Sequence, residues 1–291
     1  MIWAAFASVA AVTVSAEAII EKGVLRREDP GLFSAIVMVL SGCIVLPFLW
    51  IVDWSKLTLP VLAWIMLCSL VMSTAFFLAT RSMKHMEISL FAPMSTITPA
   101  FVAIIAALTL GETLGRGQWV GIFLLVFGGY CLQLKPGQSW LYPCQRLIQC
   151  RDLHYLAVAL LLYPIASVMG RYTFTRLGIL PYHYLVLMRI FAAMYFLLYI
   201  HFRRGGFKAM RKHIPRHKGA FFWISLLNTT NGAALSLALA GAYVVKVLAV
   251  VKLSSLVTTI VGGGMFHEHY MLRKTIACIV MLVGVAWVVF G

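Results

Sequence analysis

The chain has 291 residues, of which 62% are hydrophobic and only 11% are charged, and its formal net charge is +15. Soluble domains are about half apolar and about a quarter charged, so this composition excludes a soluble protein and predicts an all-α integral membrane protein. The positive charges lie in short segments between apolar stretches, as membrane topology requires, and form no basic face on a soluble module. We therefore expect the lipid bilayer as a partner and no binding of nucleic acid.

Ten apolar stretches can each cross a bilayer, which takes about 20 residues of helix. Most connectors between them are short, so consecutive helices are expected to run antiparallel. The connector 202–218 carries seven lysines and arginines and is predicted to face a solvated surface with anionic lipid. The ten stretches are approximately 2–20, 32–51, 58–79, 90–110, 118–134, 154–173, 181–201, 219–240, 244–265 and 274–290.

The second half of the chain repeats the first at an offset of 156 residues. At this offset the break at Glu112 falls on Glu268 and the late glycine Gly128 falls on Gly284. Because each half contains five predicted helices, the second half must insert upside down relative to the first, as in many secondary transporters. We therefore predict two inverted five-helix repeats, residues 1–134 and 154–291, joined by the loop 135–153.

The positive charges also predict an orientation. The odd-numbered connectors hold 17 of the 24 lysines and arginines, whereas the even-numbered connectors and their margins hold 4. By the positive-inside rule, the odd connectors are cytoplasmic and both termini lie outside.

The sequence resembles the EamA-type permeases of the drug/metabolite transporter superfamily. The resemblance is carried by Ser89–Gly129, where a span with two prolines leads into LGETLGRGQWVGIFLLVFGG, and by Tyr184–Leu198, where Arg189 occupies the place of the family's frequent arginine. It implies a multi-pass transporter of the cell membrane, with both termini in the cytoplasm. The sequence contains no Walker loop, no Ser/His/Asp constellation and no H-E-x-x-H motif, so we expect no enzyme activity and no cofactor. The chain departs from the family pattern at its second break, which reads His267-Glu268 in place of Gly-Glu.

Three cations lie inside predicted spans: Arg171, Arg189 and Lys252. Ionisable residues within membrane helices usually face a water-filled cavity or a partner. Lys252 and Arg189 are therefore candidate substrate ligands, and with Arg171 they are expected to give a central cavity a positive character that attracts a carboxylate or phosphate. The alternative for Arg189 is structural, through bonds to backbone carbonyls or to an acid on a neighbouring helix.

Glu17 is the acid most clearly inside a span, so it is the candidate proton carrier. The alternative is that Glu17, Glu21 and Lys22 form a cluster at the membrane interface.

A polar patch deep in the eighth span supplies further candidate substrate ligands at Asn228, Thr229 and Asn231. Such groups also satisfy one another across membrane helices, which is the alternative. Tyr163 is a candidate for the wall of the same pocket, and packing explains it equally well. The motif His267-Glu268-His269 is too weak a signal to predict a metal site.

These observations predict a secondary active transporter or facilitator that moves a small polar or anionic metabolite, such as an amino acid or organic acid, by alternating access. The competing hypothesis is a polytopic membrane enzyme acting on lipid-linked substrates. A homodimer is compatible with either hypothesis.

Overall fold

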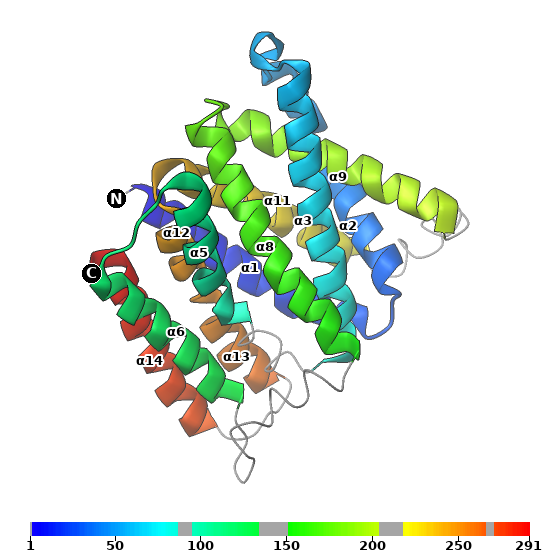
Figure 1. The fold of residues 1–291 in the computed structure, drawn as a ribbon. Coiled ribbons are helices and arrows are strands. Elements are labelled where there is room, and N and C mark those ends of the chain that lie inside the picture. Colours follow the sequence, from blue (N-terminus) through cyan, green and yellow to red (C-terminus); the bar gives the residue numbers. More distant parts are fainter. Residues whose placement is uncertain (1, 87–94, 134–150, 204–217, 266–270) are drawn as a thin grey trace.

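The computed structural model describes residues 2–86, 95–133, 151–203, 218–265 and 271–291, and every regular element in these ranges is a helix (Figure 1). The first half contains α1 (Ile2–Leu25), α2 (Pro30–Val45), the 3₁₀ helices η1 (Leu46–Ile51) and η2 (Trp54–Lys56), α3 (Leu59–His85), η3 (Ser95–Ile97), α5 (Thr98–Leu110) and α6 (Arg116–Gln133). The second half contains α8 (Arg151–Thr175), α9 (Pro181–Arg203), α11 (Lys218–Gly241), α12 (Val244–Val251), α13 (Ser254–Met265) and α14 (Met271–Phe290).

Five segments in the described part of the chain are long and apolar enough to cross a membrane by themselves. The remaining apolar helices are shorter. The all-helical membrane fold agrees with the composition, while the count of ten spans remains a prediction. The five segments are Ile2–Leu25, Pro30–Ile51, Leu59–His85, His154–Thr175 and Pro181–Phe202.

Local sequence signals explain where several helices begin and end. Asp29 caps α2, because its carboxylate accepts the N–H groups of Gly31 and Leu32 at 2.9 and 3.1 Å, and Pro30 occupies the first turn. Gly111 ends α5 in the left-handed conformation, with a φ of +71° that other residues rarely adopt.

The predicted span 244–265 is interrupted rather than continuous. Helix α12 ends at Val251, Lys252 and Leu253 form a turn, and α13 begins at Ser254. The sequence shows no proline or glycine at this break, which is why a single helix was the natural expectation.

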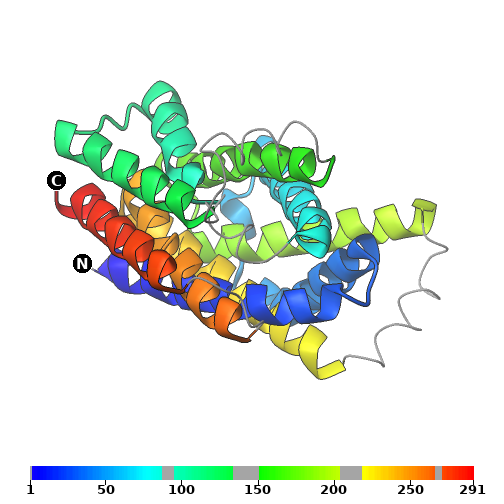
Figure 2. The same ribbon diagram turned by 90° about the horizontal axis from the view of Figure 1, so that it is seen from below.

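The main helix pairs each join one helix from the first half of the chain to one from the second. Helix α1 packs along α11, α3 along α8, α2 against α9, and α6 against α14. Figure 2 shows α6 and α14 lying side by side at one end of the molecule. The two halves are therefore interleaved rather than separate.

The α6–α14 contact is close because it is made of small residues. A Cβ on Gly121 would lie 2.7 Å from both the carbonyl oxygen of Gly284 and the amide nitrogen of Val288. A Cβ on Gly128 would lie 3.0 Å from the carbonyl oxygen of Ala277. Backbones approach this closely in membrane helices where such residues face one another.

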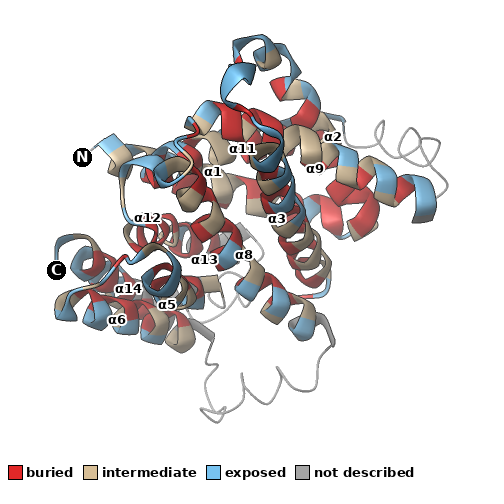
Figure 3. Ribbon diagram, turned by 45° about the horizontal axis from the view of Figure 1, so that its top comes forward, coloured by how far each residue is buried: buried red, intermediate tan, exposed pale blue. Residues whose placement is uncertain are grey.

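Burial follows the expected pattern for a membrane bundle. Buried residues concentrate on the facing sides of the helices, including α11 and α12, whereas exposed ones lie on outer faces such as those of α3, α5 and α6 (Figure 3). Large apolar side chains on the outside, such as Leu108 at 82% and Phe290 at 77% exposure, suit contact with lipid.

Candidate functional site

A cavity of about 290 Å³ lies between the helices of the two halves. Its walls come from α1, α2, α3 and α5 of the first half and from α8, α9, α11, α12 and α13 of the second. Among its lining residues, those with a hydrogen-bonding or charged side chain discussed below are Glu17, Glu21, Thr80, Tyr163, Arg189, Asn228, Asn231 and Lys252.

Three of the predicted residues form one hydrogen-bonded chain along a wall of this cavity. The Arg189 guanidinium donates to the side-chain oxygen and to the backbone carbonyl of Asn228, each at 2.5 Å. The Asn228 amide in turn donates to Glu17 Oε1 at 2.6 Å. Asn228 therefore links the cation on α9 to the acid on α1, which lowers the cost of burying both charges.

Space around Arg189 is limited by a neighbouring helix. A Cβ on Gly232 of α11 would clash with the guanidinium, so the absence of a side chain there lets the arginine reach Asn228. Arg189 thus bonds to a backbone carbonyl near an acid, as the structural alternative expected, and it also lies on the cavity wall.

Glu21 is a cavity residue that the sequence did not single out. It is 4% exposed, and its Oε1 accepts the Thr80 hydroxyl at 2.9 Å. The sequence offered Glu21 only within the alternative of an interfacial cluster with Glu17 and Lys22, and the structure places it on the cavity wall. The signal was present, because residues four apart share a face of a helix and Glu17 already pointed inward.

Lys252 lines the cavity at the turn between α12 and α13. Its backbone is anchored, since its carbonyl accepts the hydroxyl of Ser255 at 2.8 Å and its N–H donates to the carbonyl of Leu248 at 2.9 Å. Within the described ranges its ammonium group makes no hydrogen bond or ion pair. The cation that the sequence placed inside a span therefore lies at a helix break, beside a cavity.

The polar patch on α11 is divided between two environments. Asn228 and Asn231 line the cavity, and the side-chain oxygen of Asn231 is buried with no hydrogen-bond donor among the described residues. Thr229 is buried outside the cavity lining and donates to the carbonyl of Ser225 at 2.8 Å. Tyr163 of α8 lines the cavity, as expected for a wall residue.

Most of the remaining lining is apolar and flexible. Four methionines contribute, namely Met38, Met72, Met83 and Met188, together with Phe76 and several leucines. Methionine side chains adapt to ligands of different shape because they are unbranched and polarisable.

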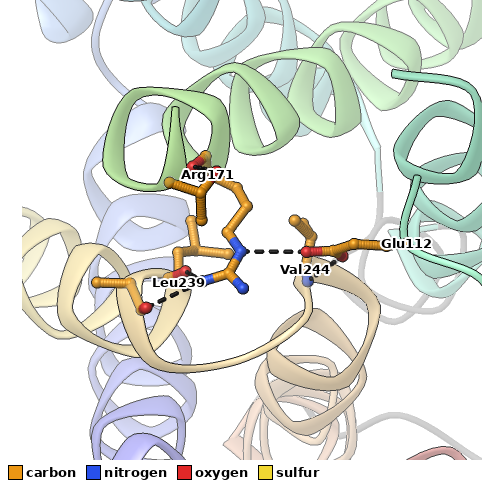
Figure 4. Close-up of polar contacts among 6 residues, drawn as sticks. Glu112, Arg171, Leu239 and Val244 are labelled. Atoms are coloured by element: carbon orange, nitrogen blue, oxygen red, sulfur yellow. Dashed lines mark hydrogen bonds and ion pairs between the residues drawn. The ribbon is translucent and has the colours of Figure 1, made fainter. Parts of the chain in front are cut away.

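Arg171 does not line the cavity, so the expectation that it makes the cavity positive is wrong. Figure 4 shows its side chain directed at Glu112, with Nε 3.1 Å from Oε1, and at the end of α11, where Nη1 donates to the carbonyls of Leu239 and Ala240 at 2.6 and 2.9 Å. The other oxygen of Glu112 accepts the N–H of Val244 at 3.0 Å. This ion pair ties the α5–α6 turn to α8, α11 and α12.

The side chain of a second cation, Lys22 of α1, reaches the end of α3. Lys22 Nζ donates to the carbonyls of Met83 and Lys84 at 2.6 and 3.3 Å, and also to that of Met86. At the 156-residue offset, Met83 and Lys84 correspond to Leu239 and Ala240, the carbonyls that Arg171 binds. Equivalent helix ends in the two halves are therefore each capped by a basic side chain from another helix of the same half.

The histidines of the His267-Glu268-His269 motif lie outside the described residues. Within the described ranges, no group of three or more His, Cys, Asp or Glu side chains is arranged to hold a metal ion.

Residues 1–133 match the model of the EamA-like transporter family. A stretch of 125 residues is 24% identical to the uncharacterized transporter YwfM of Bacillus subtilis (strain 168), and it covers 40% of this chain and 40% of that protein. The fold is similar to that of a protein of known crystal structure, with a TM-score of 0.68 over 98% of this chain and 97% of the other, at 15% sequence identity. That last likeness bears on the fold alone.

Proposed function

We propose that this chain is a secondary active transporter or facilitator. By its first 133 residues it belongs to the EamA-like transporters of the drug/metabolite transporter superfamily, and it is a multi-pass protein of the cell membrane. Its cargo is a small polar or anionic metabolite, such as an amino acid or organic acid. The observation that carries the proposal is the cavity between the two halves, whose walls hold buried charged groups where a transporter of this architecture binds its solute.

The proposed movement is a rocking of one half against the other, with the halves as inverted five-helix repeats. The helix pairs support it, because the 156-residue offset converts the α1–α11 pair into the α8–α3 pair and leaves α2–α9 and α6–α14 paired as they are. The same offset converts the contact between Gly121 and Gly284 into the contact between Ala277 and Gly128. Two equivalent packing arrangements are what alternating access requires.

The proposed substrate ligands are Lys252, Arg189, Asn228, Asn231 and Tyr163. All five line the cavity, whereas Thr229 lies outside the lining and its hydroxyl bonds to the carbonyl of Ser225 within α11.

Glu17 is the proposed proton carrier. It lies in the same cavity and is hydrogen-bonded to the residue that also holds Arg189. Protonation of Glu17 would therefore change the charge balance next to the substrate ligands.

Reconstitution of the purified protein into liposomes tests this function. A thermal-shift screen against metabolite classes first identifies a solute that binds, since binding to the folded state raises its stability. The labelled solute is then expected to accumulate in preloaded liposomes without chemical change. Conversion of a lipid-linked or soluble substrate into a product would instead identify a membrane enzyme and refute transport.

A further inference from the structure

The charges that line the cavity are balanced rather than positive. Among the described lining residues there are two carboxylates, Glu17 and Glu21, and two cations, Arg189 and Lys252. One cation and one carboxylate already share Asn228 as a common partner. Lys252 and Glu21 are the two charged lining groups that do not share this partner.

We propose that the cavity selects a zwitterionic solute with an apolar body, whose acid group is bound by Lys252 and whose ammonium group is bound by Glu21 and Asn231. The proposal rests on the transport function proposed above and narrows its substrate class.

The cavity contains both a hydrogen-bond donor and hydrogen-bond acceptors that are available to a ligand. The Lys252 ammonium is a donor without a partner among the described residues, and the buried Asn231 side-chain oxygen is an acceptor without one. Among the described residues, Glu21 accepts only the Thr80 hydroxyl, at one of its two oxygens. Buried polar groups are costly unless they are hydrogen-bonded, so a fitting ligand supplies an acceptor to Lys252 and a donor to the other two.

Singly charged solutes fit this arrangement less well. A simple anion would neutralise Lys252 and leave the Glu21 carboxylate buried without a cation, and a simple amine would leave Lys252 unpaired instead. An uncompensated buried charge is strongly unfavourable. A zwitterion pairs both groups at once.

The elements that carry the two groups are adjacent. The Ser15 hydroxyl on α1 donates to the carbonyl of Ser254, two residues after Lys252, at 3.1 Å. Glu21 lies on the same helix as Ser15, fewer than two turns further along. The α12–α13 turn with Lys252 is therefore fixed against the helix that carries both acids.

The rest of the cavity specifies the body of the solute. Its methionine, phenylalanine and leucine side chains offer an apolar, adaptable surface to a side chain of variable shape. A volume of about 290 Å³ is at the lower end for ligand pockets, which favours a small molecule.

Three probes of matched shape test the proposal on the purified protein in detergent. Leucine carries both charges, isoamylamine only the ammonium and isocaproate only the carboxylate, while glycine keeps both charges without the apolar body. Isothermal titration and thermal shift are expected to detect leucine, with the other three at least about tenfold weaker, a difference of about 1.4 kcal/mol. Methionine and phenylalanine, each with its amine and acid analogue, extend the series to other side chains.

Two substitutions make the test specific. Glu21→Gln is expected to weaken leucine about tenfold and to bring isocaproate up to or above it, whereas Lys252→Met should weaken leucine similarly and favour isoamylamine. Lys56→Met and Asp53→Asn change an exposed ion pair outside the cavity and should leave all affinities unchanged.

The outcomes separate this proposal from the function on which it rests. Binding of isocaproate or isoamylamine as tightly as leucine, or no binding of any zwitterion in the series, overturns the zwitterion while transport of another solute still stands. Wild-type leucine affinity in both cavity variants overturns the assigned ligands. Size-exclusion profiles show which variants fold. If a variant does not fold, the relative affinities of the probes for the wild-type protein still test the preference for a zwitterion.

Discussion

Removing one partner of the buried Glu112–Arg171 ion pair is expected to destabilise the fold strongly. Replacing Glu112 with alanine removes the acceptor for Arg171 at 3.1 Å and for the Val244 N–H at 3.0 Å. The Arg171 side chain, only 12% exposed, would then keep its charge with backbone carbonyls as its remaining partners. Breaking a buried pair in this way costs about 3–5 kcal/mol. At roughly 2 °C per kcal/mol for a long chain, the Tm should fall by about 6–10 °C.

Thermal unfolding in one detergent, at one scan rate, measures this effect. The matched control is Lys56→Ala, which breaks the exposed pair with Asp53 and should leave the Tm unchanged. The double variant Glu112→Leu with Arg171→Met removes both charges and should lose less than the sum of the Glu112→Leu and Arg171→Met single variants, each measured alone, because they act on one interaction. A Glu112→Ala protein within 1 °C of wild type, or strictly additive effects of the Leu and Met substitutions in that cycle, would refute the reasoning.

Three further expectations concern packing, the site and the orientation. Gly121→Ala places a Cβ 2.7 Å from the carbonyl of Gly284 and should lower the free energy of unfolding by about 1–3 kcal/mol, measured by thermal unfolding. Gly115→Ala, with nothing within 4 Å of its Cβ, should be neutral. Equal Tm values for the two variants would contradict the close packing. Lys252→Ala should lower transport or substrate-dependent stabilisation while the protein still inserts into the membrane, and wild-type activity would remove it from the site. Cysteine labelling in the connector 202–218 should require access to the cytoplasm, and labelling from outside intact cells would overturn the orientation given by the charges.

The fold class follows from the sequence because lipid leaves few alternatives. A bilayer provides no hydrogen bonds for backbone groups, so long apolar runs become helices. Each of the ten apolar stretches falls largely on described helices, although 244–265 is divided between α12 and α13. The break at Lys252 could not be read in the same way, since no proline or glycine marks it in the sequence.

The candidate site was predictable where a single residue is unusual for its surroundings. Lys252, Arg189 and Glu17 are ionisable groups within apolar stretches, and all three line the cavity. Their partners were less predictable because they come from other helices, as with Asn228 between Arg189 and Glu17.

Arg171 shows the opposite outcome. It has the same sequence character as Arg189, but it lies near the end of α8, where Glu112 and free backbone carbonyls are within reach. Depth along the helix, and not the presence of a charge in an apolar stretch, separates the two arginines.

Alternating access is tested most directly by asking whether one cavity residue can be reached from both sides of the membrane. Ser73 lines the cavity on α3 and is 2% exposed. In a cysteine-free variant carrying Ser73→Cys, a membrane-impermeant thiol reagent applied to either side of reconstituted liposomes should label this position, and bound substrate should slow both reactions. Labelling from one side only, with solute flux intact, would contradict the account.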